Sequence, residues 1–183
     1  MINYLANPKR FLKFSKVIQP LLGYSSLILI TIGLYFSLLD SPEDYQQGHT
    51  VRIMYVHVPS AWIGLASFTS IALLSILSFI FKIKNLNLIT KSIAPIGLLF
   101  TCLAIVTGSL WGKPTWGTWW AWDARITSMM VLSIFYILFI LSHKLIEQED
   151  KAIKVSNIIA IIEEILITFF LFSKIFQDNK YKQ

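Results

Sequence analysis

The chain has 183 residues, of which 55% are hydrophobic and only 14% are charged. A soluble domain is about 45–50% apolar and about 25% charged, so the apolar excess must face lipid. This composition excludes a disordered chain, a collagen, a disulfide scaffold and a soluble α/β enzyme. The net charge of +6 is typical of membrane proteins, which carry Lys and Arg on their cytoplasmic side, and it does not indicate nucleic acid as a partner. We therefore expect an all-α integral membrane protein.

Four apolar stretches are long enough to cross a bilayer, which takes about 20 residues. They are residues 17–39, 58–81, 92–110 and 126–142. A fifth stretch, 155–172, is marginal because Glu163 and Glu164 near its centre offset the gain from its apolar residues. We expect this fifth segment to be marginal or re-entrant, and we expect the two adjacent carboxylates to point to different helix faces. Residues 1–183 are predicted to form a single polytopic membrane domain.

Lys and Arg are unevenly distributed between the connecting segments. Four precede the first span, three lie in 81–91 and three in 143–154, whereas the segments 40–52 and 110–125 together hold three. Because basic residues accumulate on the cytoplasmic side, the N-terminus is predicted to be cytoplasmic. The segments 40–57 and 111–125 are then the outward-facing loops.

The outward segment 111–125 holds five of the six tryptophans: Trp111, Trp116, Trp119, Trp120 and Trp122. An interfacial aromatic belt explains one or two tryptophans at a helix end, but not five. Gly112, Pro114 and Gly117 are expected to interrupt the third helix. The i, i+3, i+4 spacing of Trp116, Trp119 and Trp120 then predicts that these indoles share one face of a short interfacial helix.

Charged residues accompany these indoles. Asp123 is expected to be the N-cap of the fourth helix, and Arg125, Lys113 and Arg52 supply cations nearby. Flat indole faces beside cations suit a large planar ligand with an apolar body and anionic edges. Haem is such a molecule, and sterols, quinones and lipid headgroups also fit this composition.

The histidines differ in position. Pro59 is favourable in the first turn of a helix, so the second helix is expected to begin near it and to place His57 at the outer interface. There His57 is either an iron ligand or a structural histidine bonded to the backbone. His49 lies in the same outer loop, whereas His143 lies on the inner side and is not expected to join them.

At these residues the chain resembles the CcmC family, the haem-handling membrane proteins of bacterial and mitochondrial cytochrome c maturation. The resemblance runs through residues 41–48, 52–59, 94–97 and 107–114. It is most specific in residues 116–128, which contain the tryptophan-rich WWD signature of haem-handling proteins. It extends to about residue 162, and residues 163–183 read as a divergent tail.

The resemblance implies six transmembrane helices and a haem site on the periplasmic face of the bacterial inner membrane. His57 matches the family's first axial ligand to the iron. The cradle for the ring is expected from Trp111, Trp116, Trp119, Trp120, Trp122, Asp123 and Arg125. Haem would bind non-covalently and transiently, and would then pass to a periplasmic haem chaperone. An ABC-type ATPase with its permease subunits would be further partners, and the chain itself would be a platform and not an enzyme.

One feature departs from the family pattern. The family carries a second axial histidine in an outer loop between its fifth and sixth helices, and this chain has neither that loop nor a sixth apolar segment. The chain therefore resembles a haem platform that lacks its last quarter. His49 is a candidate substitute for the second ligand. Two alternatives stay open, a non-functional remnant produced by a frameshift near codon 162 and a subunit that transports haem through the bundle.

Overall fold

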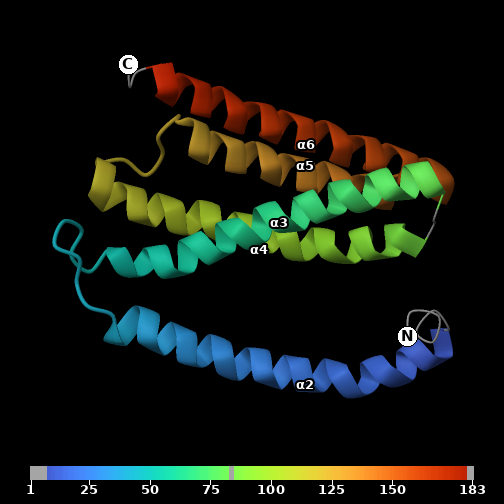
Figure 1. The fold of residues 1–183 in the computed structure, drawn as a ribbon, viewed down its shortest axis with the longest axis horizontal. Coiled ribbons are helices and arrows are strands. Elements are labelled where there is room, and N and C mark those ends of the chain that lie inside the picture. Colours follow the sequence, from blue (N-terminus) through green and yellow to red (C-terminus); the bar gives the residue numbers. More distant parts are fainter. Residues whose placement is uncertain (1–7, 83–84, 181–183) are drawn as a thin grey trace. The chain divides into compact units, whose positions relative to one another are not determined.

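The computed structural model describes residues 8–82 and 85–180, and it confirms an all-α fold there. Lys84, which entered the charge count, and residues 181–183 of the tail lie outside the described residues, as do residues 1–7. The helices are α2 (Pro8–Tyr35), α3 (Val51–Phe81), α4 (Asn85–Trp116), α5 (Ala124–Leu145) and α6 (Glu149–Lys180) (Figure 1). A single π-helical turn, η1 (Phe36–Asp40), continues α2.

The chain divides into two compact units, Met1–Asp44 and Tyr45–Gln183. The first unit contains α2 and η1. Its apolar stretch is long enough to cross a membrane, and none of that stretch is buried within this unit. A helix of this length and composition is typical of a membrane span.

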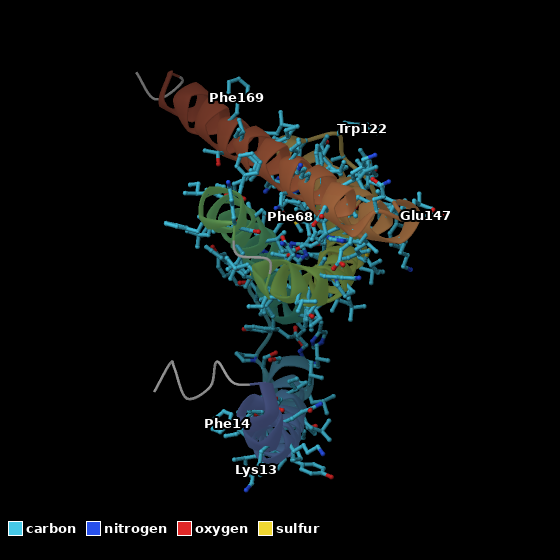
Figure 2. All side chains as sticks on the ribbon, turned by 90° about the vertical axis from the view of Figure 1, so that its right-hand side faces the viewer. Lys13, Phe14, Phe68, Trp122, Glu147 and Phe169 are labelled. Atoms are coloured by element: carbon cyan, nitrogen blue, oxygen red, sulfur yellow. The ribbon has the colours of Figure 1, made fainter. Side chains whose placement is uncertain are left out.

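The second unit is a four-helix bundle. α3 packs against α4 and α6, and α5 packs against the same two helices. The segment before α3 and the α4–α5 connection lie at one end of this bundle, and the other two connections lie at the opposite end (Figure 1). Phe68 lies in the interior of the bundle and Trp122 at its edge (Figure 2). The bundle therefore brings both predicted outer loops of this unit to one end.

The bundle interior is organised around Tyr136 of α5, which is completely buried. Its ring packs edge-on against Phe68 of α3, with the ring centroids 4.7 Å apart. Its hydroxyl donates to the Gly64 carbonyl at 2.7 Å, which satisfies a polar atom that would otherwise be costly to bury. The hydroxyl occupies the space that a side chain at Gly97 would need. One phenol of α5 thus joins α3 and α4.

Four helices are apolar and long enough to cross a membrane within the described residues: Lys13–Asp40, Val51–Phe81, Leu86–Trp116 and Ala124–Leu145. The prediction of a multi-pass membrane protein with four such spans is confirmed. α6 is one continuous helix without the turn of a re-entrant segment. Glu163 is completely buried, whereas Glu164 is half-buried and accepts a hydrogen bond from Thr69 at 3.4 Å. The adjacent carboxylates therefore point to different sides of α6, as predicted.

Two helix boundaries differ from the prediction. α3 begins at Val51, about two turns before Pro59, and Pro59 lies inside it. α4 does not stop at Leu110 but passes Pro114 and ends at Trp116. Proline is tolerated inside such helices because neighbouring side chains re-satisfy the freed backbone groups.

The stop of α4 is set by Gly117, which has φ of +78°. This left-handed conformation ends helices and costs glycine little. The residues between Gly117 and Asp123 form no helix. The prediction that Trp116, Trp119 and Trp120 share a short interfacial helix is therefore wrong.

Candidate functional site

A cavity of about 370 Å³ lies between α3, α4, α5 and α6. It is lined by four of the residues predicted from the sequence, which are His57, Trp111, Trp116 and Arg125. Most of the remaining wall is apolar and comes from Val58, Ala61, Leu65, Ile105, Met129 and Ile167. Its volume falls in the range of small-molecule sites, about 300–1,000 Å³. The bundle thus brings residues that are far apart in the sequence to one apolar site.

His57 lies in the second turn of α3, and its ring packs against α4. Nδ1 is 2.9 Å from the Ala104 carbonyl oxygen and 3.2 Å from the Thr107 hydroxyl oxygen. A carbonyl is only an acceptor, so Nδ1 carries the proton and donates it. In a neutral ring with this tautomer Nε2 holds the lone pair, which is the form in which imidazole binds a metal. The two readings of His57, backbone-bonded and metal-ligating, are compatible because they use different nitrogens.

Two indoles extend from His57 along α4. The Trp111 ring lies 5.9 Å from the His57 ring, and the Trp116 ring lies 6.0 Å from the Trp111 ring, measured between centroids. Trp111 Nε1 donates to Gln47 Oε1 at 2.8 Å, which ties the turn before α3 to the end of α4. The pair forms a continuous aromatic wall beside the histidine.

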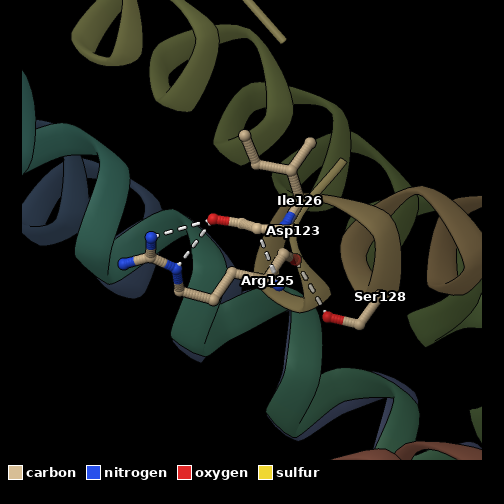
Figure 3. Close-up of polar contacts among 4 residues, drawn as sticks. All are labelled: Asp123, Arg125, Ile126 and Ser128. Atoms are coloured by element: carbon tan, nitrogen blue, oxygen red, sulfur yellow. Dashed lines mark hydrogen bonds and ion pairs between the residues drawn. The ribbon is translucent and has the colours of Figure 1, made fainter. Parts of the chain in front are cut away.

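Arg125 places a cation at this wall. Its guanidinium carbon lies 5.1 Å from the centroid of the Trp116 ring, within cation–π range. Asp123 also holds the guanidinium, with Arg125 Nη2 donating to Oδ2 at 2.8 Å and Nε at 3.2 Å (Figure 3). Ser128 Oγ donates to the Arg125 carbonyl one turn further on, at 2.9 Å. Arg125 is therefore positioned by its own helix.

Asp123 is the N-cap of α5, as predicted from the sequence. Its Oδ1 accepts from the backbone N–H groups of Arg125 at 2.9 Å and Ile126 at 3.0 Å. Partial burial acts to raise the pKa of Asp123, but the hydrogen bonds from Ile126 and Arg125 and the charge of Arg125 outweigh it, so the net pKa is lowered. Both carboxylate oxygens are engaged with α5, so Asp123 orients the arginine at the site.

The other three tryptophans lie in the non-helical loop and do not line the cavity. Trp119 is 55% exposed and Trp122 is 78% exposed. Trp120 is half-buried, with its ring 5.6 Å from that of Trp122. Lys113 connects this loop to α4, because its Nζ donates to the Gly117 carbonyl at 3.1 Å and lies 5.9 Å from the Trp119 ring centroid.

The other two histidines do not line the cavity. His49 lies in the turn before α3, where its carbonyl accepts from the Arg52 N–H at 3.2 Å, and it does not line the cavity. His143 lies in the last turn of α5, at the opposite end of the bundle from His57. The prediction that His143 does not join His57 agrees with this placement.

Some residues at the site were not predicted. Ala104 and Thr107 contact the His57 ring, and a side chain at position 108 would crowd it. Met129 lines the cavity one turn beyond Arg125. A signal existed in the sequence, because positions 104, 107, 108 and 111 repeat at i, i+3, i+4 and i+7 and so share one face of α4 with Trp111. The partner of that face, His57, is apparent only in the fold.

A family model described as heme exporter protein C, CcmC, matches residues 1–180. The chain belongs to the CcmC family. Among curated relatives, heme exporter protein C of Bradyrhizobium diazoefficiens is 38% identical over 169 residues, and that of Haemophilus influenzae is 35% identical over 168 residues. Each alignment covers 92% of this chain. The Escherichia coli protein of the same name is 41% identical over 136 residues, or 74% of this chain.

The chain spans only part of these CcmC relatives. The alignments cover 64% of the Bradyrhizobium protein, 68% of the Haemophilus protein and 56% of the Escherichia coli protein. The CcmC family match continues to residue 180 and so extends past Ile162, where the resemblance was expected to end. The segments that build the cavity, from His57 to Ile167, all lie inside the matched range.

Proposed function

We propose that this chain is a membrane platform that binds haem non-covalently and presents it for transfer in cytochrome c maturation. The observation that carries the proposal is one cavity that combines an imidazole hydrogen-bonded through Nδ1, two indoles in series and one guanidinium. Each group matches a different part of haem. The printed name of the relatives, heme exporter protein, supports the same cargo.

His57 is the proposed iron ligand, through Nε2. Trp111 and Trp116 offer π-faces on which a porphyrin ring stacks, and Arg125 pairs with a propionate. The apolar remainder of the cavity accepts the hydrocarbon edge of the ring. A sterol or quinone needs no imidazole with a free lone pair, so His57 favours haem over these ligands.

The loop tryptophans Trp119, Trp120 and Trp122 extend the cradle outward in this proposal. Two of them expose most of their surface, which leaves apolar area for the part of the haem that projects from the cavity. Asp123 contributes indirectly by holding Arg125 beside Trp116. The cargo leaves unaltered, so the proposed role is binding and transfer and not catalysis.

The proposed setting is the bacterial inner membrane, with the haem site on the periplasmic side and the N-terminus in the cytoplasm. The distribution of Lys and Arg supports this orientation. A periplasmic haem chaperone is the proposed recipient, and an ABC-type ATPase with its permease subunits completes the system. Membrane lipid surrounds the apolar faces of the bundle.

Haem binding is tested by purifying the chain in detergent after expression with haem. The wild-type chain is expected to retain haem with a Soret band, and His57→Ala is expected to lose at least about nine-tenths of it, because losing a ligand should cost no less than losing its supporting contacts, about 10–100-fold. His143→Ala is the matched control and should retain haem. A wild-type chain without haem, or a His57→Ala variant with the wild-type spectrum, would contradict the proposal.

Delivery is tested by co-expressing the chain with the haem chaperone and the ATPase complex. Covalent haem on the chaperone that depends on His57 supports the platform. Haem binding without any delivery indicates a non-functional remnant. Haem that accumulates inside sealed vesicles without the chaperone indicates a transporter.

A further inference from the structure

We propose that Thr107 and Gly108 of α4 are positioning residues that hold the His57 imidazole with Nδ1 protonated and Nε2 directed to bind iron. The identity of the metal rests on the proposed function, whereas the state of the imidazole does not. The proposal starts from the position of the ring, which lies on the backbone of the neighbouring helix.

Gly108 makes the close approach possible. A Cβ built at Gly108 would lie 3.0 Å from His57 Cε1 and 3.3 Å from Nδ1, which is tighter than ordinary carbon contacts. The distance to Nε2 would be 3.9 Å, so Nε2 is the ring nitrogen farther from this position. Any side chain at position 108 would push the ring away from α4 and lengthen the bond from Nδ1 to the Ala104 carbonyl.

Thr107 completes the environment of Nδ1. Its hydroxyl donates along its own helix, to the Leu103 carbonyl at 2.7 Å or the Ala104 carbonyl at 3.2 Å, which leaves its lone pairs for His57. Nδ1 therefore faces two acceptors, the Ala104 carbonyl and the Thr107 hydroxyl. An unprotonated Nδ1 would set its lone pair against that of the Ala104 carbonyl, and the Thr107 hydroxyl would have to give up its helical bond to donate to Nδ1, so the other tautomer is disfavoured.

This arrangement corresponds to the outer contacts of metal-bound histidines. A second-sphere oxygen that accepts from one ring nitrogen fixes the tautomer and the ring plane and makes the other nitrogen more basic, and losing it costs about 10–100-fold in metal affinity. The Ala104 oxygen belongs to the backbone and a substitution does not remove it. Thr107 and Gly108 are the positions at which mutation changes the arrangement.

The first test uses the haem-free chain and ¹⁵N NMR of the His57 ring. In the wild type, Nδ1 is expected to carry the proton, and Gly108→Ala is expected to shift the ring towards a mixture of tautomers. A wild-type ring protonated at Nε2, or a Gly108→Ala spectrum identical to that of the wild type, would overturn the proposal. Gly33→Ala is the matched control, because a Cβ there meets nothing within 4 Å.

The second test measures haem affinity and the Soret position. Gly108→Ala is expected to weaken binding about 10-fold, Thr107→Val to weaken it less and to shift the Soret band, and Thr107→Ser to restore the wild-type spectrum. Thr31→Val is the control, since Thr31 Oγ1 makes the same type of helical bond, to the Leu27 carbonyl at 2.8 Å.

The outcomes separate the two proposals. If the wild type binds haem through His57 but Thr107→Val and Gly108→Ala bind it equally well, the positioning role is wrong and the proposed function stands. If the wild type binds no haem, the proposed function fails, and the NMR result alone decides whether Thr107 and Gly108 set the state of His57.

Discussion

At the start of α5 a single carboxylate performs two tasks. Asp123 caps the helix through Oδ1 and holds the Arg125 guanidinium through Oδ2. The ion pair is well exposed, with 62% of the Arg125 side chain accessible, so by itself it contributes little, about 0–1 kcal/mol. The ion pair instead orients the Arg125 guanidinium, because it keeps this cation beside Trp116 at the cavity.

Removing the cap separates these tasks. Asp123→Ala is expected to lower the free energy of unfolding by about 1 kcal/mol, because an N-cap acceptor is lost. Asp123→Asn keeps an acceptor for the helix but loses the pairing with Arg125, so it should retain most of the stability while weakening haem binding. Thermal unfolding in detergent and haem titration measure the two effects. Equal loss of stability in both variants would contradict the division of roles.

The lowered pKa of Asp123 also predicts a pH dependence. Because the folded-state pKa lies below the ordinary value of 3.8, ionised Asp123 contributes its full stabilisation above that value and loses it as pH falls through the folded pKa. The wild-type melting temperature should therefore fall more steeply than that of Asp123→Asn below about pH 4. Parallel pH profiles of the two proteins would show that the carboxylate contributes nothing.

Among the elements, α3, α4 and α5 meet at the side chain of Tyr136. Tyr136 donates to the Gly64 carbonyl and occupies the space beside Gly97. Gly97→Ala is expected to cost about 1–3 kcal/mol, because the added methyl group overlaps the hydroxyl and forces these helices apart. Gly33→Ala in α2 adds the same methyl group in open space and should not destabilise. Comparison of the two melting temperatures checks this, and equal values would contradict the packing described for Tyr136.

α6 places an ionisable side chain in the bundle interior. Glu163 is completely buried, and neither carboxylate oxygen has a hydrogen-bond partner in the part of the chain that the structure describes. Replacing it with an apolar residue of similar size removes this desolvation cost, so Glu163→Leu is expected to stabilise the bundle by about 1–3 kcal/mol. Glu164→Leu, at the half-buried neighbour, should change stability less. A destabilised Glu163→Leu variant would show that the buried carboxylate is needed by the fold.

For the whole molecule, the proposed orientation can be measured directly. In a Cys102→Ser background, Thr115→Cys at the outer end of α4 should react with a membrane-impermeant thiol reagent in spheroplasts. Lys151→Cys at the start of α6 should react only after the membrane is opened, because the basic connections are expected inside. The reverse labelling pattern would invert the proposed topology.

Local signals predicted several parts of this structure correctly and failed at others. Asp123 as an N-cap followed from one side chain before an apolar helix, and its geometry depends only on neighbours. Pro59 and Pro114 were taken as boundaries, but helices α3 and α4 pass through them. Local breaker signals are weaker in apolar surroundings, where leaving the helix exposes backbone groups that have no water to bind.

The sequence by itself determined the class of protein, the four apolar spans and the set of aromatic, basic and histidine residues near one end of the bundle. These follow from composition and from patterns within single helices, whose causes are local. Only the tertiary structure decided that His57 meets Ala104, Thr107 and Gly108, that two of the five clustered tryptophans line the cavity, and that His49 does not. The reason is physical, because these contacts depend on which helix faces pack together, and that choice is made by the whole bundle.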